Sequence, residues 1–104
     1  MKLDISLITP TYNEQKNVRT ITKNINLLKP KEVIIVDGNS TDNTRKLLKN
    51  FKIIKTQASR GTQLKKGAKH SKQEWLFFIH ADTKLYIENI KDIKCFINKE
   101  NIHK

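Results

Sequence analysis

The side chains best suited to chemistry lie in three short polar stretches, each of which directly follows an apolar run. "HADT" carries His80 and Asp82 on either side of one alanine, "TPTYNE" carries Glu14, and "DGNSTDNT" begins with Asp37. Carboxylates at a site for an anionic ligand are explained by a divalent cation shared with substrate phosphates, or by hydrogen bonds to the sugar hydroxyls or base of a nucleotide. The three stretches therefore predict one site, provided that the fold brings them together.

The elements that must position these residues alternate between short apolar runs and amphipathic segments. We expect strands at 5–9, 32–37, 51–56 and 74–80, and helices at 14–29, around 47–48, at 59–71 and at 86–97. The first strand is expected to stop at Pro10, Asn13 to cap the first helix, and Pro30 to close it.

The order of these elements predicts the fold class. Strands that alternate with helices indicate an α/β protein, here a three-layer α/β/α Rossmann-like open sheet that is mostly parallel. The run at 32–37 is typical of a strand buried on both faces, 51–56 of an edge strand, and 74–80 gives the strongest strand signal. Right-handed crossovers place the loops that follow the strands at one edge, where open α/β sheets bind ligands.

Composition sets the size and the broad class. The 104 residues suffice for one small domain, and the net charge of +11 rests on 18 Lys and three Arg against 10 acidic residues. A solvated lysine-rich surface explains this charge, and so does attraction to the phosphates of a nucleotide, an anionic membrane or a nucleic acid. Because arginine is favoured for bidentate phosphate contacts, the lysine excess argues against a nucleic-acid partner.

The same composition bears on the cellular compartment. One cysteine, Cys95, excludes an internal disulfide, and we interpret Cys95, His70 and His103 as incidental. No apolar run approaches the length of a membrane span or a signal peptide. We therefore expect a cytoplasmic protein, with peripheral contact at the inner membrane surface as an alternative.

Four motifs in order resemble the N-terminal, donor-binding half of a family 2 glycosyltransferase with the GT-A fold. They are "SLITPTYNE", "VIIVDGNSTDNT", "RGTQLKKGA" and "WLFFIHADT", and the match runs from Ile5 to Leu85. The chain is most similar to a small bacterial subgroup whose metal motif lies within an "HADT" string. Residues 1–104 are thus expected to form a single domain of this family, the nucleotide-sugar-binding part only.

The resemblance implies a role for individual residues in holding the nucleotide-diphosphate sugar donor. Pro10, Tyr12 and Glu14 resemble residues placed around the base and ribose. Asp37 resembles the acid that hydrogen-bonds the base, and Arg60 lies in a loop near the donor, where it would contact phosphate or sugar.

The resemblance also implies a divalent metal, Mn²⁺ or Mg²⁺, on the donor diphosphate. Asp82 corresponds to the last acid of the family's Asp-x-Asp motif, and His80 takes the place of the first. A neutral imidazole can ligate Mn²⁺ but suits Mg²⁺ poorly, so this departure bears on the choice of metal.

Each of these residues also has a purely structural interpretation. Asp82 would cap the last helix, Asp37 would form a turn, and Glu14 would favour a helix N-terminus through the dipole. His80 would be a structural residue at the end of its strand, and Arg60 would belong to a solvated helix face.

The sequence contains no recognisable acceptor-side base, which inverting glycosyl transfer requires. In the family this acid lies well after the metal motif, and the chain ends about 20 residues after "HADT". We therefore expect a truncated glycosyltransferase domain that transfers sugar to an unknown acceptor, lipid-linked acceptors included. The alternative is an inactive fragment, or a nucleotide-sugar-binding or interaction module without catalysis. Apolar faces left bare by a missing half would favour self-association or association with that half.

Overall fold

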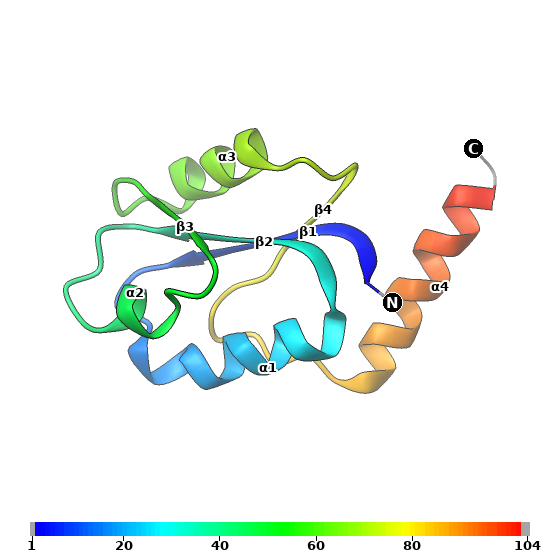
Figure 1. The fold of residues 1–104 in the computed structure, drawn as a ribbon, viewed down its shortest axis with the longest axis horizontal. Coiled ribbons are helices and arrows are strands. Elements are labelled where there is room, and N and C mark those ends of the chain that lie inside the picture. The colour runs from blue at the N-terminus through cyan, green and yellow to red at the C-terminus, as the bar shows by residue number, and fades with distance from the viewer. Residues whose placement is uncertain (1, 103–104) are drawn as a thin grey trace.

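The computed structural model describes residues 2–102 and the side chains of residues 2–98, and it forms one open α/β sheet with helices on both faces (Figure 1). The strands are β1 (Leu3–Thr11), β2 (Pro30–Asp37), β3 (Lys52–Lys55) and β4 (Trp75–Phe78). The helices are the 3₁₀ turn η1 (Gln15–Asn17), α1 (Val18–Leu28), α2 (Thr44–Leu47), α3 (Arg60–His70) and α4 (Ile87–Ile102). The four strands are parallel and lie in the order β3-β2-β1-β4.

The two faces of the sheet follow from the alternation of side chains along each strand. On one face Ile5, Leu7 and Ile35 join the main core, which α1 and α4 cover. On the other face Ile8 and Val36 belong to a smaller apolar cluster, which α3 covers (Figure 1). Buried apolar residues on both faces account for the continuous apolar runs of the two central strands.

Gly67 sets the distance between α3 and the sheet. A Cβ added at Gly67 would lie 2.4 Å from Cγ2 of Ile8 and 3.1 Å from Cγ2 of Val36. The helix approaches the sheet closely because no side chain intervenes at this position. The glycines of "RGTQLKKGA" weaken the helical pattern in the sequence, whereas Gly67 is in fact what allows the helix to pack.

Two expected strand boundaries were wrong. The first strand does not stop at Pro10 but continues to Thr11, and Pro10 is in register with Val36 of β2. On its other side, β1 pairs with β4 only from Ile5 to Ile8, so the missing N–H of Pro10 leaves no ladder bond unmade. The fourth strand is four residues long rather than seven and lies at an edge.

Candidate functional site

The carboxyl ends of the strands surround a hollow of about 270 Å³, which we call the Asp82 hollow. Six of the seven predicted site residues line it, Asp37 being the exception. Its lining consists of Pro10, Thr11, Tyr12, Glu14, Ala58, Arg60, Gln63, His80, Ala81 and Asp82. The loops after β1 and β4 and the start of α3 therefore meet as the parallel topology requires.

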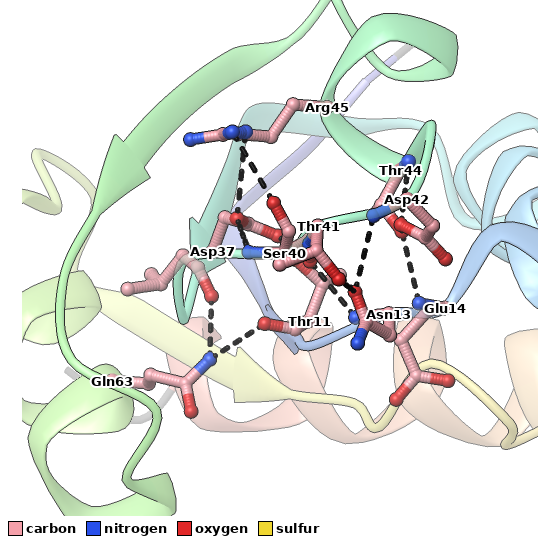
Figure 2. Close-up of polar contacts among 11 residues, drawn as sticks. Thr11, Asn13, Glu14, Asp37, Ser40, Thr41, Asp42, Thr44, Arg45 and Gln63 are labelled. Carbon is pink, nitrogen blue, oxygen red and sulfur yellow. Dashed lines mark hydrogen bonds and ion pairs between the residues drawn. The ribbon is translucent and has the colours of Figure 1, made fainter.

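Asp37 lies beneath this site as a buried anchor of the loop that follows β2 (Figure 2). Its carboxylate accepts hydrogen bonds from the Thr11 hydroxyl at 2.7 Å and from the backbone N–H and hydroxyl of Ser40 at 2.8 and 2.6 Å. Nε of Arg45 lies 3.7 Å from it. The structural interpretation of Asp37 as a turn residue is thus confirmed, and its contact with a base stays a prediction that requires one carboxylate oxygen to become free.

Asn13 joins the loop after β1 to the loop after β2 (Figure 2). Its backbone is left-handed, with φ at 52°, and its Oδ1 accepts hydrogen bonds from the backbone N–H groups of Thr41 and Asp42 at 2.8 and 3.3 Å. The expectation that Asn13 caps the first helix was wrong, because Glu14 and Asn17 occupy the cap positions of η1 and α1. The side chain instead satisfies the backbone of the neighbouring loop.

Glu14 is held by the same pair of loops, with its backbone N–H donating to the Thr44 hydroxyl at 2.9 Å. Its side chain accepts a bond from Asn17 and still borders the Asp82 hollow. Asp42 accepts bonds from the Thr44 hydroxyl and from the backbone of Thr44 and Gln15, and the hydroxyl bond holds the pKa of Asp42 below its ordinary value. The hydroxyl and backbone N–H of Thr44 therefore favour the charged form of Asp42.

Gln63 is a site residue that the motifs did not reveal. Its side chain is buried, and Nε2 donates to the backbone oxygens of Thr11 and Val36 at 2.9 and 2.8 Å (Figure 2). One amide group thus ties the ends of β1 and β2 together from the first turns of α3. Because the partners of Gln63 are backbone carbonyls, no second side chain in the sequence points to its role. The signal that the sequence does contain is a polar residue three positions after Arg60, on the side of the helix that becomes buried.

The "HADT" segment is positioned by α1. Asn24, which is buried, donates from Nδ2 to the Thr83 oxygen at 2.7 Å and accepts from the Leu85 N–H at 3.0 Å. His80 and Asp82 are both exposed and both border the hollow. The alternative role of Asp82 as a helix cap is excluded, because α4 begins five residues later, at Ile87.

A second hollow adjoins the first and shares Tyr12 and Ala58 with it. We call it the Lys55 hollow, and its lining consists of Tyr12, Gly38, Asn39, Thr41, Lys55, Thr56, Gln57 and Ala58. Its volume of about 780 Å³ lies within the usual range of small-molecule sites. The two hollows together run along the carboxyl edge of the sheet from β3 to β4.

The ligand set for a metal is incomplete in the protein alone. Within the described residues there is no group of three or more His, Cys, Asp and Glu side chains that could hold a metal ion. Asp82 and His80 nevertheless border the same hollow as Arg60. Mn²⁺ and Mg²⁺ at such sites are usually held by one or two protein ligands together with substrate phosphates and water, so Asp82 and His80 fit a metal that arrives with its diphosphate.

Comparison with known proteins identifies the family of this fold and site. The model of glycosyl transferase family 2 matches residues 6–102, which is nearly the whole chain. The chain belongs to glycosyl transferase family 2. Its resemblance to this family, drawn from four motifs, is thereby confirmed.

Relatives of known function share this family 2 domain. The poly(ribitol-phosphate) beta-N-acetylglucosaminyltransferase TarP of Staphylococcus aureus is 31% identical over 110 residues, which cover 93% of the chain and 33% of TarP. The poly-beta-1,6-N-acetyl-D-glucosamine synthase of Staphylococcus epidermidis is 34% identical over 89 residues, covering 76% of the chain and 22% of that enzyme. The chain thus spans a third or less of the length of these relatives.

A solved structure shows the same fold. The glucosyl-3-phosphoglycerate synthase of Mycobacterium tuberculosis, in complex with Mn²⁺, uridine diphosphate and phosphoglyceric acid, aligns with a TM-score of 0.67 at 20% identity. The alignment covers 77% of the chain and 33% of the synthase. The expected α/β fold of glycosyltransferase type is confirmed.

Proposed function

We propose that this family 2 domain binds a nucleotide-diphosphate sugar and acts as the donor-holding part of a glycosyltransferase. The observation that carries this proposal is the meeting of Glu14, Arg60, His80 and Asp82 in one hollow at the carboxyl edge of the sheet. Nothing in the packing of the core requires these four partly or fully exposed side chains to converge. Their convergence provides cationic and metal-binding groups for a diphosphate beside acceptors for hydroxyl groups.

The donor would lie across the two hollows. We place the base and ribose beside Tyr12 and Glu14, toward the Lys55 hollow, and the diphosphate beside Arg60 in the Asp82 hollow. Pro10 lines the Asp82 hollow, where its ring fixes the backbone near the end of β1. Asp37 would reach the base only after exchanging one of its bonds to Ser40.

Asp82 and His80 would hold the divalent metal together with the donor phosphates. Such a metal neutralises charge that develops on the leaving diphosphate. The histidine in place of a second acid favours Mn²⁺ over Mg²⁺ in this hollow, because imidazole is a poor ligand for Mg²⁺. This histidine is also the feature that supports placing the chain in the subgroup with the "HADT" string.

Calorimetry with uridine diphosphate tests the proposal. We expect binding that strengthens when Mn²⁺ is added, and an Asp82→Asn variant that loses at least about tenfold in affinity in the presence of Mn²⁺. Asp92→Asn on the exposed surface of α4 is the matched control and should bind like the wild type. Equal binding with and without Mn²⁺, or equal binding by wild type and Asp82→Asn, would reject the proposed donor site.

The alternative is a module that holds the donor without transferring the sugar. It is favoured by the lining of the Asp82 hollow, where Glu14 and Asp82 are already assigned to the donor and no further acid remains to serve as a base among the described residues. Glu88 and Asp92 are exposed on α4 and do not border the hollow. Release of sugar from the donor by the isolated chain, measured as free nucleotide diphosphate, would exclude this alternative.

The acceptor and the location belong to the same proposal. We propose work in the cytoplasm at the inner membrane surface, on an acceptor that is lipid-linked or polymeric. No helix within the described residues is both long and apolar enough to cross a bilayer. TarP, whose acceptor is poly(ribitol phosphate), gives a precedent for a polymeric acceptor in the family.

A further inference from the structure

The amino edge of the sheet, opposite the donor site, carries a concentration of lysines. Two hollows border the C-terminal end of α1 there and share Asn26 and Lys29. We call the two together the lysine groove. Its six lysines, all exposed, are Lys2, Lys29, Lys31, Lys52, Lys91 and Lys94.

The lysine groove differs from the Asp82 hollow in the charge of its lining and in the apolar residues of its floor. None of the described residues that line it is acidic or an arginine, whereas Glu14 and Asp82 line the Asp82 hollow. Its floor is apolar, with Val33 and Phe51 in one hollow and Leu27 in the other. Lysines around a partly apolar surface are the pattern of proteins that rest on an anionic membrane.

Three of the six lysines line one hollow from two elements, Lys29 at the end of α1 and both Lys91 and Lys94 on α4. Lys29 ends α1 in a left-handed conformation with φ at 51°, and this bend directs the chain into β2. Lys91 and Lys94 are three positions apart on α4 and line the hollow together with Ile87, whose side chain is 58% exposed. The cations and an exposed apolar side chain are thus presented together at one face of the molecule.

We propose that the lysine groove binds the anionic headgroups of a lipid bilayer. The inference rests on the proposed work at the membrane surface, and it names the face that makes the contact. Because β1 rises about 3.3 Å per residue over the nine residues from Leu3 to Thr11, the donor site would stand roughly 25 Å above the groove. The donor hollow would then face the water from which a nucleotide sugar arrives.

Lipid headgroups fit this groove better than a nucleic acid does. The charged residues that line it are all lysines, of which Lys31 is paired with Asp4; their ammonium groups act as point charges and lack the planar fork that arginine uses on phosphates and bases. The aromatic residues needed to stack on unpaired bases are limited here to Phe51, which is only partly exposed. Each lysine near an anionic bilayer contributes about fivefold to the partition constant.

Vesicle sedimentation tests the inference with a triple variant, Lys29→Gln, Lys91→Gln and Lys94→Gln. The wild type should bind phosphatidylcholine vesicles that contain phosphatidylglycerol, and added salt should release it. It should not bind vesicles of phosphatidylcholine alone. The triple variant should lose about a hundredfold in partitioning. All three positions are exposed, so the variant is expected to fold, and thermal unfolding checks this.

The matched control carries the same loss of charge on the opposite face of the sheet. It is the triple variant Lys65→Gln, Lys66→Gln and Lys69→Gln, three exposed positions on α3. We expect it to remain within about tenfold of the wild type, because these lysines lie on α3, on the other face of the sheet, and do not line the groove. Uridine diphosphate binding should be unchanged in both variants, which separates this inference from the proposed donor site.

Three outcomes would overturn the inference. Equal losses in the two triple variants would mean that total charge, and no particular face, drives binding. Failure of the wild type to bind phosphatidylglycerol vesicles would exclude the bilayer as partner. Displacement from the vesicles by single-stranded RNA, with RNA affinity that depends on Lys29, Lys91 and Lys94, would assign the groove to nucleic acid instead.

Discussion

Single polar side chains that bond to backbone groups hold the loops around the Asp82 hollow in place. Gln63 is the clearest case, because its amide bonds to Thr11 and Val36 hold two strand ends in register beneath the hollow. Asn24 does the same for the "HADT" segment. Sequence motifs do not reveal such residues, because their partners are backbone groups, which every residue type has. Glu14 and Asp82 could be placed at one edge from the sequence because the strand ends of a parallel sheet meet there, whereas Arg60 was named only from the resemblance to the family.

A Gln63→Leu substitution tests the bridging role. It leaves two buried carbonyl oxygens without this donor, so the free energy of unfolding should fall by about 1–3 kcal/mol. Urea unfolding measures the change. Gln57→Leu, in an exposed loop residue, is the control and should change stability by less than about 0.5 kcal/mol. Equal stability of Gln63→Leu and wild type would show that the amide is dispensable.

Glu32 introduces a dependence of stability on pH at the opposite edge of the sheet. Burial alone would raise its pKa, but hydrogen bonds from the backbone of Lys72 and the hydroxyl of Ser6, with nearby lysines, lower the pKa below 4.5. A carboxyl with a lowered pKa stabilises the fold above its unfolded pKa and loses that contribution as the pH falls through the folded value.

A Glu32→Gln variant should therefore be less stable than wild type near neutral pH, and the difference should shrink below about pH 4.5. Urea unfolding at several pH values measures it. Glu88→Gln removes an exposed acid from α4 and reports the effect of lost charge alone. A difference between wild type and Glu32→Gln that stays constant down to acid pH would contradict the assigned hydrogen bonds.

At the scale of elements, the order of strands and helices follows from the sequence, whereas several boundaries do not. Alternating apolar runs and amphipathic segments predict all four strands and the helices between them. The extension of β1 through Pro10 depends on where β4 stops pairing, which only the assembled sheet determines. The start of α4 was expected at residue 86 and lies at Ile87, whereas its end at Ile102 lies beyond the expected residue 97. His103 lies outside the described residues.

The packing of α3 makes a second prediction, carried by two glycines of one helix. Gly67→Ala should destabilise the fold by about 1–3 kcal/mol, because its Cβ would overlap Ile8. Gly61→Ala meets no atom within 4 Å and should be neutral or stabilising by up to about 1 kcal/mol, since alanine favours the helix. Thermal unfolding of both variants measures the contrast. Equal effects at the two positions would refute the close approach of α3 to the sheet.

At the scale of the whole molecule, the two edges of the sheet differ in protection. β3 is flanked by Lys52 and Lys55, which discourage pairing with another strand. β4, from Trp75 to Phe78, carries no charge, and Phe78 is 47% exposed. Within the described residues the strand that pairs with β4 is β1.

We accordingly expect the chain to self-associate through β4 at high concentration. Phe78→Lys should shift the sedimentation profile toward monomer, because a charge at a free edge opposes strand addition. Leu47→Lys, at a residue of α2 that is 51% exposed, is the control and should leave the profile unchanged. A wild type that sediments as a monomer at every concentration would contradict this expectation.

We propose that the Asp82 hollow holds a metal only together with a nucleotide diphosphate, and the electron paramagnetic resonance of Mn²⁺ tests this coupling. Free Mn²⁺ gives a signal that is lost on binding to a protein complex. With Asp82 and His80 as the protein ligands, the chain alone should reduce the signal little. Chain and uridine diphosphate together should reduce it beyond what the nucleotide does by itself, and Asp82→Asn should abolish that excess. If the chain leaves the Mn²⁺ signal unchanged in the presence of uridine diphosphate, Asp82 and His80 do not hold the metal. If the chain reduces the signal equally with and without the nucleotide, the metal does not depend on the diphosphate.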